Sequence, residues 1–396
     1  MPIGGVISNF PQGFANGINV RGVPLLQAQP GNVFWLNNTP NVQAYAAGGS
    51  DNNRGTYQRP FATLAGALAA CLPGNNDIIM VGPNHQENIS SATATVMSAS
   101  GVAVIGMGSG QGRPAFTFDT AATATIKVAG ESMSVQNCLF VGNFLSVASA
   151  FTAVSSSFTG VIASGVLTVS SLTGSVYVGS VIRGAGVTPG TVIISQLSGT
   201  TNGVGTYKLS GTQTLASVSM TTQSTDFAID NCEFHDTSGI LGFLSIYTTS
   251  STANHSDRFS LTRSIWNSLG TVSPTVAISC GAAQDGWNIS DNFMVSPTTA
   301  VTEGPILLAT GSASLTAFNC ARNTTQRPGV STTIPCGIST SGTAWTGHCY
   351  DNKMGTGLSG GTGIWINTGT KLAFTNNYSM ITRAADKSAL INPAAV

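Results

Sequence analysis

The sequence predicts an all-β solenoid, a parallel β-helix, and two observations carry this prediction. Seven short segments read alike: each has an apolar residue, polar positions rich in Asn and Cys, and a return to an apolar residue or Thr. Aligned on their fourth residues, they follow one another at steps of 94, 32, 28, 31, 29 and 25 residues. Strand-like patterning with a fixed period near 30 is typical of stacked turns of short strands joined by polar bends. The segments are Val135–Phe140, Ile229–Phe234, Leu261–Trp266, Ile289–Met294, Cys320–Thr325, Cys349–Met354 and Phe374–Ser379.

The residues that recur in these segments suit the bends of a solenoid. Asn bonds to nearby backbone and tolerates left-handed conformations, and Cys is small enough to stack in the same column. The alternative is an ordinary β-sandwich whose turns are similar by chance. Sandwiches place turns every 8 to 12 residues or so and do not repeat a motif near 30, so the period favours the solenoid.

Composition restricts the function classes. Charged residues are 8% of the chain, and 15 Lys and Arg balance 15 Asp and Glu. Ser, Thr, Asn and 47 Gly fill positions where Lys and Glu would be usual. A surface with so few charges provides little electrostatic repulsion between monomers, so we expect other subunits to cover much of it. The scattered basic residues argue against nucleic-acid binding, which needs a basic stripe.

Two further classes are not expected. The chain has no run of about 18 apolar residues and no secretory signal at its start, which predicts no membrane span and no export. Seven cysteines without a C-x-x-C pair predict buried thiols rather than a disulfide framework or a zinc site, and we expect no cofactor and no metal. The alternative is a disulfide between Cys138 and Cys232, which would lie on adjacent turns about 4.8 Å apart.

The elements before the repeat are expected in this order. Residues 1–32, rich in Gly and Pro, predict an extended N-terminal arm, with a disordered terminus as the alternative. Val33–Leu36 is the first strand, and strands resume at Asp77–Val81 and Gly101–Ile105. The arm residues expected to mediate assembly are Phe10, Phe14, Val20, Arg21, Leu25 and Leu26.

One amphipathic helix is expected near residues 60–72. Phe61, Leu64 and Leu68 share a face, the stretch opens with Pro60, and Pro73 ends it. An open solenoid end exposes core and unpaired backbone, so a short helix here would cap the first turns.

The 94-residue step predicts an insertion. One ordinary turn accounts for about 30 residues, and residues 156–222 fit the remainder with alternating Val, Thr and Ile between Gly-rich turns. We expect a small all-β module looping out of a body formed by residues 33–155 and 223–396.

The densest acidic cluster is the candidate for catalysis. Asp226, Asp230, Glu233 and Asp236 lie with His235 within one turn, and glycoside hydrolysis needs two carboxylates. Strand alternation places Glu233 on the face opposite Asp230 and Asp236, and Asp230 fills a recurring bend position. These acids are therefore expected to be structural, with catalysis as the weaker alternative.

The remaining motifs do not predict a catalytic or binding site. The second acidic pair, Asp285 with Asp291, is weaker. The four histidines lack a metal-binding spacing, and Gly106–Gly112 precedes an extended segment rather than the helix that a phosphate loop requires. The tryptophans that could grip a sugar are expected in the core or at an interface: Trp266, Trp287, Trp345 and Trp365.

The string Gly48–Ala69 resembles the opening motif of pectate-lyase-like right-handed β-helix proteins, with a Gly-x-Asp turn and Pro-Phe-x-Thr before the capping helix. The insertion resembles small Gly, Val and Thr modules of tailed-phage virion proteins, and Phe10–Pro24 resembles the start of phage structural proteins of this type. The resemblance implies a right-handed parallel β-helix in a phage virion. Such proteins are commonly homotrimers that serve as tailspikes or as capsid decoration proteins. The calcium ligands and basic residue of pectate-lyase chemistry do not map onto this chain.

The expected function is therefore that of a non-enzymatic virion protein. We expect a capsid decoration or cement protein that forms a homotrimer, contacts the major capsid protein or another virion protein, and lies on the particle surface after assembly in the host cytoplasm. The alternative is a tailspike-like glycan depolymerase with Asp230, Glu233 or Asp236 as acid and base. A third possibility is a module that holds a host surface glycan without cleaving it.

Overall fold

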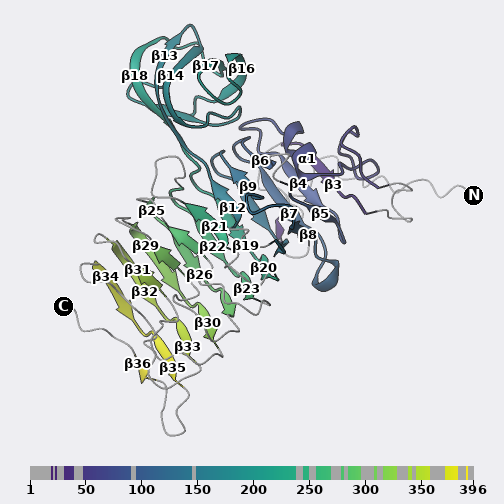
Figure 1. The fold of residues 1–396 in the computed structure, drawn as a ribbon, viewed down its shortest axis with the longest axis vertical. Helices are drawn as coiled ribbons and strands as arrows, with labels where there is room; N and C mark the ends of the chain where they lie inside the picture. The colour runs from purple at the N-terminus through teal and green to yellow at the C-terminus, as the bar shows by residue number, and fades with distance from the viewer. Residues whose placement is uncertain are drawn as a thin grey trace, which may run out of the picture.

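The chain is a parallel β-helix in which successive turns pass through three parallel sheets (Figure 1). The computed structural model describes residues 19–20, 23–24, 31–39, 48–90, 95–144, 149–237, 244–248, 256–268, 278–280, 284–295, 307–309, 315–327, 338–340, 345–356, 371–381 and 389–390. The turn that precedes the insertion is representative: β10 lies in the first sheet, β11 in the second and β12 in the third.

The first sheet has eleven strands. In spatial order they are β3 (Val33–Leu36), β4 (Ile78–Val81), β7 (Ala103–Gly106), β10 (Ser134–Gln136), β19 (Ala228–Asp230), β22 (Ser260–Thr262), β26 (Asn288–Ser290), β29 (Leu315–Ala321), β32 (Trp345–Tyr350) and β34 (Lys371–Thr375), with β25 (Gln284–Asp285) beside β29.

The second sheet has ten strands and the third has seven. The second contains β5 (Gln86–Asn88), β8 (Ala115–Phe118), β11 (Leu139–Gly142), β20 (Glu233–Asp236), β23 (Ile265–Ser268), β27 (Phe293–Val295), β30 (Thr324–Arg327), β33 (Lys353–Thr356), β35 (Tyr378–Ile381) and, antiparallel to β35, β36 (Ala389–Leu390). The third contains β6 (Thr95–Met97), β9 (Ile126–Val128), β12 (Ser149–Ala153), β21 (Leu244–Thr248), β24 (Ile278–Cys280), β28 (Leu307–Ala309) and β31 (Ile338–Thr340).

Strand register confirms the alignment of the seven repeated segments. Each segment's first residue pairs with the first residue of the next segment, from Val135 and Ile229 to Cys349 and Phe374. The 94-residue step is thus a single step of the solenoid. Three earlier turns, through β3, β4 and β7, extend the same sheet without the motif.

The third residue of every repeated segment has a left-handed backbone, with φ between 50° and 60°. These residues are Asn137, Asn231, Arg263, Asp291, Arg322, Asp351 and Asn376. This conformation costs a non-glycine residue about 1 kcal/mol or more, and Asn and Asp bear it best. It turns the chain sharply from the first sheet to the second, which explains why the motif recurs at this point of each turn.

The fourth residue of every segment points into the body and is buried. The set is Cys138, Cys232, Ser264, Asn292, Asn323, Asn352 and Asn377, and its last four members form a ladder of stacked amides, here called the asparagine ladder. At Asn323, the backbone N–H donates to Asn352 Oδ1 at 2.9 Å, and Nδ2 donates to the carbonyl of Ile289 at 2.8 Å and to Asn352 Oδ1 at 3.0 Å. Asn323 Oδ1 accepts from the backbone and side-chain N–H groups of Asn292 at 3.1 and 2.9 Å. Each amide therefore satisfies backbone groups on the turns beside it.

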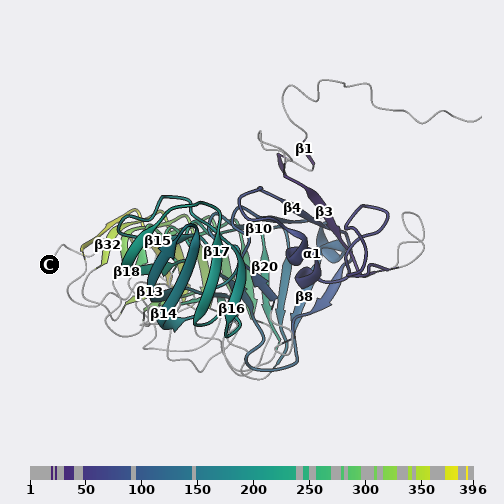
Figure 2. The ribbon, with the colours of Figure 1, turned by 90° about the horizontal axis from the view of Figure 1, so that it is seen from above.

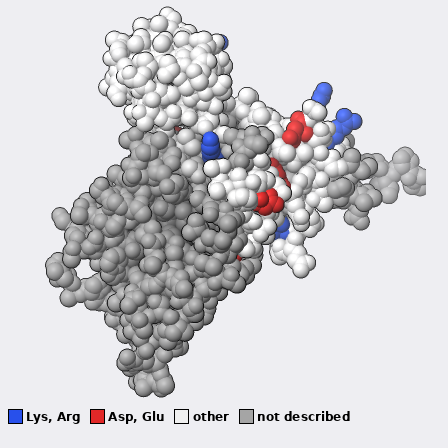
Figure 3. Space-filling view, viewed as in Figure 1, with Lys and Arg blue, Asp and Glu red and all other residues white. Residues whose placement is uncertain are grey.

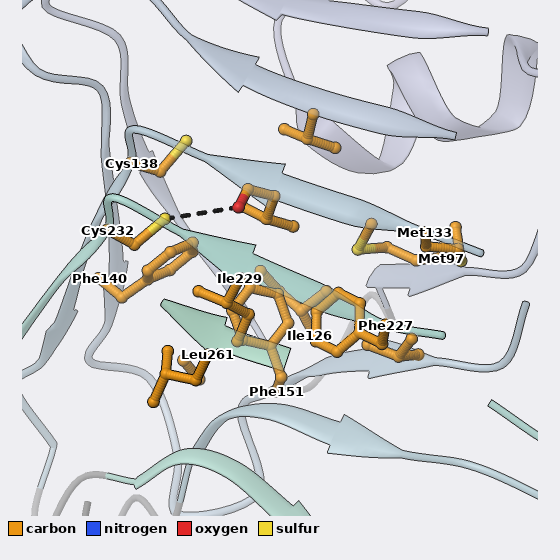
Figure 4. Close-up of a cluster of buried hydrophobic side chains, with 14 of the residues drawn as sticks. Met97, Ile126, Met133, Cys138, Phe140, Phe151, Phe227, Ile229, Cys232 and Leu261 are labelled. Carbon is orange, nitrogen blue, oxygen red and sulfur yellow. Dashed lines mark hydrogen bonds between the residues drawn. The ribbon is translucent and has the colours of Figure 1, made fainter. Parts of the chain in front are cut away.

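Aromatic side chains also pack in the interior of the body. Phe140 stacks between Phe116 at 5.7 Å and Phe234 at 5.3 Å, and its edge meets Phe151 at 4.9 Å. Figure 4 shows Phe140 and Phe151 in this cluster of buried side chains. Buried side chains from successive turns thus form one continuous core, as a solenoid requires.

The described cysteines at 71, 138, 232, 320 and 349 are buried free thiols, as the composition predicts. Cys138 and Cys232 lie on neighbouring turns (Figure 4), but they are not joined, so the disulfide alternative is wrong. Burial raises the pKa of both thiols.

The N-terminal end of the body is closed by a short helix, α1 (Leu64–Ala70), which Figure 2 shows at the end away from β32. Thr63 is its N-cap and accepts from the Gly66 N–H at 3.0 Å. Asp51 holds this cap, because Oδ1 accepts from the Thr63 N–H at 2.9 Å and Oδ2 from the Thr63 hydroxyl at 2.7 Å. The Gly-x-Asp turn and the Pro-Phe-x-Thr string are thus two halves of one cap.

The expected helix over residues 60–72 is too long. Leu64 and Leu68 are buried in α1, but Phe61 precedes the helix and forms a parallel bridge with Leu36. The Phe61 N–H donates to the carbonyl of Trp35 at 2.8 Å. Phe61 is therefore part of the cover over the first strand edge, and backbone pairing there prevents the helix from starting at Pro60.

Residues 156–222 form an antiparallel six-stranded sheet with a core of its own. Its spatial order is β15 (Ile182–Gly184), β18 (Leu215–Thr222), β13 (Ser156–Ala163), β14 (Val166–Gly174), β17 (Gly205–Leu209) and β16 (Ile193–Gly199). An antiparallel bridge pairs Val181 with Val192, the residues that directly precede the edge strands β15 and β16. Figure 1 shows this module beside the body, near β9 and β12.

Polar contacts fix the module against the body. Ser180 Oγ donates to the carbonyl of Ala129 at 3.0 Å, and Ser100 Oγ donates to the carbonyl of Gly179 at 3.1 Å. Arg183 bonds Glu131 at 2.8 Å. Gly179 has a φ of 99°, and a Cβ there would lie 2.6 Å from the carbonyl oxygen of Ser98, so only glycine allows this approach.

Of the arm, the structure describes β1 (Asn19–Val20) paired antiparallel with β2 (Val23–Pro24), and Gly31 and Asn32. Five of the residues expected to mediate assembly lie outside the described residues, and for Val20 only the backbone is described. These five are Phe10, Phe14, Arg21, Leu25 and Leu26.

We predict that Asn323→Ala lowers the free energy of unfolding by roughly 3 to 5 kcal/mol, because it breaks several buried hydrogen bonds and orphans their partners. Asn319→Ala is the matched control, since Asn319 is only half-buried and donates to Asn288 Oδ1 at 2.6 Å. Its expected cost is under about 1 kcal/mol. Urea unfolding followed by circular dichroism measures both; equal losses would contradict a special role for the ladder.

Candidate functional site

The three acids considered for catalysis, Asp230, Glu233 and Asp236, lie in and around the bend between the first and second sheets. Asp230 ends β19, Asn231 turns the chain with a φ of 52°, and Glu233 begins β20. The side chains of Asp230 and Glu233 are 18% and 28% exposed, whereas Asp236 is fully buried. Of these three carboxylates, only those of Asp230 and Glu233 therefore reach the solvent.

The sequence-based prediction of which acids share a face is wrong for one residue. Glu233 and Asp236 do lie on opposite faces of β20, but Asp230 lies on the outside with Glu233. Strand alternation does not continue through the left-handed bend at Asn231, because the two acids belong to different sheets. The burial of Asp236 also removes it as an acid or base for an external ligand.

Asp230 is bound by residues of the next turn. Arg263 Nε donates to Oδ1 at 2.8 Å, and Arg263 Nη2 donates to Oδ2. The hydroxyl of Thr262 donates to Oδ1 at 2.8 Å. This two-pronged contact raises the pKa of Arg263 and occupies both oxygens of the carboxylate.

Glu233 is paired on the other side. Arg113 Nη1 lies 3.1 Å from Oε1, and His235 Nε2 lies 3.7 Å from Oε2. Burial lowers the pKa of His235, the charge of Glu233 opposes this shift, and Arg113 adds to it. The lowered pKa favours the neutral imidazole near pH 7, so Arg113 is the cation that balances Glu233.

The pairing continues along the bend. Arg322 Nε and Nη2 each donate to a different carboxylate oxygen of Asp291 at 2.6 Å, and the guanidinium lies 6.0 Å from the ring centre of Tyr350. Arg322 lowers the pKa of Asp291. We call Asp230, Arg263, Asp291 and Arg322 the ion-pair ladder, because each arginine binds the aspartate of the preceding turn.

A similar pair lies at the bend that precedes the first sheet, where Arg258 bonds Asp226 at 2.6 and 2.7 Å. Asp285, of the second expected acidic pair, lies before β26 and accepts from Thr316 at 2.7 Å, whereas Asp291 follows β26. Opposite ends of one strand separate the two, so Asp285 and Asp291 do not form a pair.

Sequence reasoning missed the arginine partners of these acids. The available signal was the third position of the repeated motif, where Arg263, Asp291 and Arg322 alternate in charge on successive turns. Side chains at one motif position stack about 4.8 Å apart, so opposite charges there meet.

The other candidate residues do not add a site. Trp266 and Trp287 are buried in the core, as expected, while the side chain of Trp345 and all of Trp365 lie outside the described residues. The segment Gly110–Gly112 is a single 3₁₀ turn followed by β8, as the extended pattern predicts.

Two kinds of feature are absent from the described part of the chain. It contains no cluster of three or more His, Cys, Asp or Glu side chains arranged to hold a metal ion. None of its helices combines the length and apolar character needed to cross a membrane.

We predict a pH-dependent contribution from the Asp291–Arg322 pair. A lowered pKa in the folded state means that the pair stabilises the fold above the ordinary Asp pKa and is lost as the pH falls through the folded value. The difference in urea midpoint between the wild type and Arg322→Gln should therefore be largest near pH 6 and shrink below about pH 4.

Lys208→Gln, on the module, is the control and should show no such trend. A difference between wild type and Arg322→Gln that is constant from pH 6 to pH 3 would show that Arg322 acts only through its contact with Tyr350.

No family model matches this chain, and neither does any curated protein. Among solved structures, the chain is similar to a rhamnogalacturonan lyase (11% identity, TM-score 0.38, covering 92% of this chain and 86% of that chain). It is also similar to pectate lyase Pel9A (11%, 0.38, 91% and 79%) and to pectin methylesterase PemA from Erwinia chrysanthemi (10%, 0.38, 93% and 94%). At these identities the similarity concerns the fold alone and says nothing of activity. The chain is a parallel β-helix.

Proposed function

We propose that the chain is a non-enzymatic structural protein of a tailed-phage particle, a capsid decoration protein that acts as a homotrimer. One observation carries the non-enzymatic part: Asp230 and Glu233 are each bound by an arginine, and Asp236 is buried. A glycosidase needs two carboxyl groups that face the substrate and are free to exchange protons. Here the exposed acids are partners in structural ion pairs instead.

The surface supports a role in assembly. Figure 3 shows the module almost free of charged atoms, and residues 156–222 contain only Arg183 and Lys208 as charged residues. Exposed apolar side chains accompany this lack of charge, among them Ile194, Leu197 and Val204 at 44%, 54% and 50% exposure. A surface with so few charges is poorly protected from association, so contacts with neighbouring subunits suit it.

In this proposal the arm attaches each subunit to the major capsid protein or another virion protein on the particle surface, after assembly in the host cytoplasm. Its side chains at Phe10, Phe14, Val20, Leu25 and Leu26 are apolar, and Arg21 adds one charge. An extended apolar segment gains most of its affinity by burial against a partner.

Deletion of residues 1–30 should abolish attachment to the particle and leave the β-helix folded. Asn32 must be kept, because its N–H donates to Asp77 at 2.7 Å and its carbonyl accepts from Ile78 at 2.8 Å. Co-sedimentation with particles lacking the protein measures attachment, and circular dichroism checks the fold. Cryo-EM of the intact particle should place the full chain on local threefold axes of the head; density at the tail would contradict the decoration role.

The enzyme alternative has its own test. The purified chain should release no reducing ends from the host's surface polysaccharide, and Asp230→Asn should change nothing. Release that Asp230→Asn or Glu233→Gln abolishes, with Asp291→Asn as the matched control in the same ladder, would establish a depolymerase. Saturable binding without release would instead indicate a glycan-binding protein.

A further inference from the structure

A group of buried polar atoms lies inside the body where the chain returns from the module. Ser224 Oγ, Thr225 Oγ1, Ser256 Oγ and Gln284 Nε2 have no hydrogen-bond partner among the described residues, and their residues are between 0% and 4% exposed. An unsatisfied buried polar group costs about 1 to 3 kcal/mol, and native proteins retain few of them. Four in one region therefore require an explanation.

These atoms belong to three consecutive turns. Ser224, Ser256 and Gln284 each stand four residues before a residue of the first sheet, and those three residues pair in register: Ala228, Ser260 and Asn288. The backbone confirms the stacking, because the Asp226 N–H donates to the carbonyl of Asp257 at 2.9 Å. Gln284 reaches back to Ser256, whose N–H donates to Oε1 at 2.7 Å.

The last contact also fixes the orientation of the Gln284 amide. Since Oε1 accepts from a backbone N–H, the other amide atom is Nε2, a donor. The carbonyl of Ser256 accepts a hydrogen bond from Trp287 Nε1 at 2.6 Å. The group thus consists of three buried hydroxyls and one buried amide donor, none of which is hydrogen-bonded by a described residue.

The distance between turns indicates what binds these four atoms. Neighbouring turns lie about 4.8 Å apart, so two short hydroxyl side chains that point the same way on stacked turns stand too far apart for a direct hydrogen bond. The longer amides of the asparagine ladder do reach across this distance. A water molecule that bonds both hydroxyls at about 2.8 Å spans this gap. A buried water typically makes about three hydrogen bonds, so about two waters satisfy the four atoms.

We propose that Ser224, Thr225, Ser256 and Gln284 form an internal water site, in which bridging water molecules connect three turns of the β-helix beneath the base of the module. The site supports residues 223–227, where the chain re-enters the body after β18. It is independent of the proposed function, since it requires neither a particle nor a trimer.

The sign of the stability change caused by one isosteric substitution tests the proposal. Thr225→Val removes a hydroxyl and keeps the shape, so loss of a bound water should lower the urea midpoint. Thr222→Val is the matched control, because Thr222 is also buried and its hydroxyl bonds Ser156 Oγ at 2.7 Å. We expect both variants to lose stability to a similar extent. A Thr225→Val midpoint equal to or above that of the wild type, with Thr222→Val still destabilised, would mean a dry site and overturn the proposal.

A crystal structure of the full chain at about 1.5 Å gives the second readout. Density within hydrogen-bond distance of Ser256 Oγ and Gln284 Nε2 should refine as water in the wild type, and one such molecule should be lost in Thr225→Val. Because all four atoms can donate, a chloride ion could take the same place; an anomalous peak there in crystals grown with bromide would identify an anion and overturn the assignment to water.

Discussion

The structure depends on how each turn passes from the first sheet to the second. The chain makes this bend in one left-handed residue, and the next residue points inward and must satisfy buried backbone groups. In the later turns Asn292, Asn323, Asn352 and Asn377 do so, each bonding the backbone of the turns beside it. A buried amide that is fully bonded specifies one register, whereas a slipped turn would leave it unsatisfied.

The outside of the same bend carries the charges of the candidate site. Because the left-handed residue itself points outward, its side chain stacks on the equivalent side chain of the next turn. Asp291 and Arg322 occupy this position and pair, and Arg263 reaches Asp230 one position earlier. Exposed ion pairs contribute little free energy, but opposite charges on successive turns oppose any slip by one turn. Pairing with arginines of the next turn thus accounts for the positions of Asp230 and Asp291.

The sequence was sufficient to predict the parts of the fold that repeat. Motif spacing predicted the stacking of Val135 on Ile229 across the 94-residue step, because periodic contacts leave a periodic signal. Phe61 could not be placed, since a bridge to Leu36 decides its conformation and a helical pattern does not reveal it. The facing of Asp230 and the burial of Asp236 depend on how far the bend rotates the chain. The buried polar group around Ser256 depends on which side chains meet inside the body. These are properties of the packed turns.

Hydrogen exchange of the ladder's backbone amides is the measurement that tests this account most directly. The N–H groups of Asn292, Asn323 and Asn352 each donate to a side-chain oxygen of the next turn. If stacked amides hold the turns together, these three N–H groups should exchange together, and only through global unfolding, with a free energy equal to that from urea denaturation. Exchange through separate, low-energy local openings would contradict the account, because the bends would then open without disturbing their neighbours.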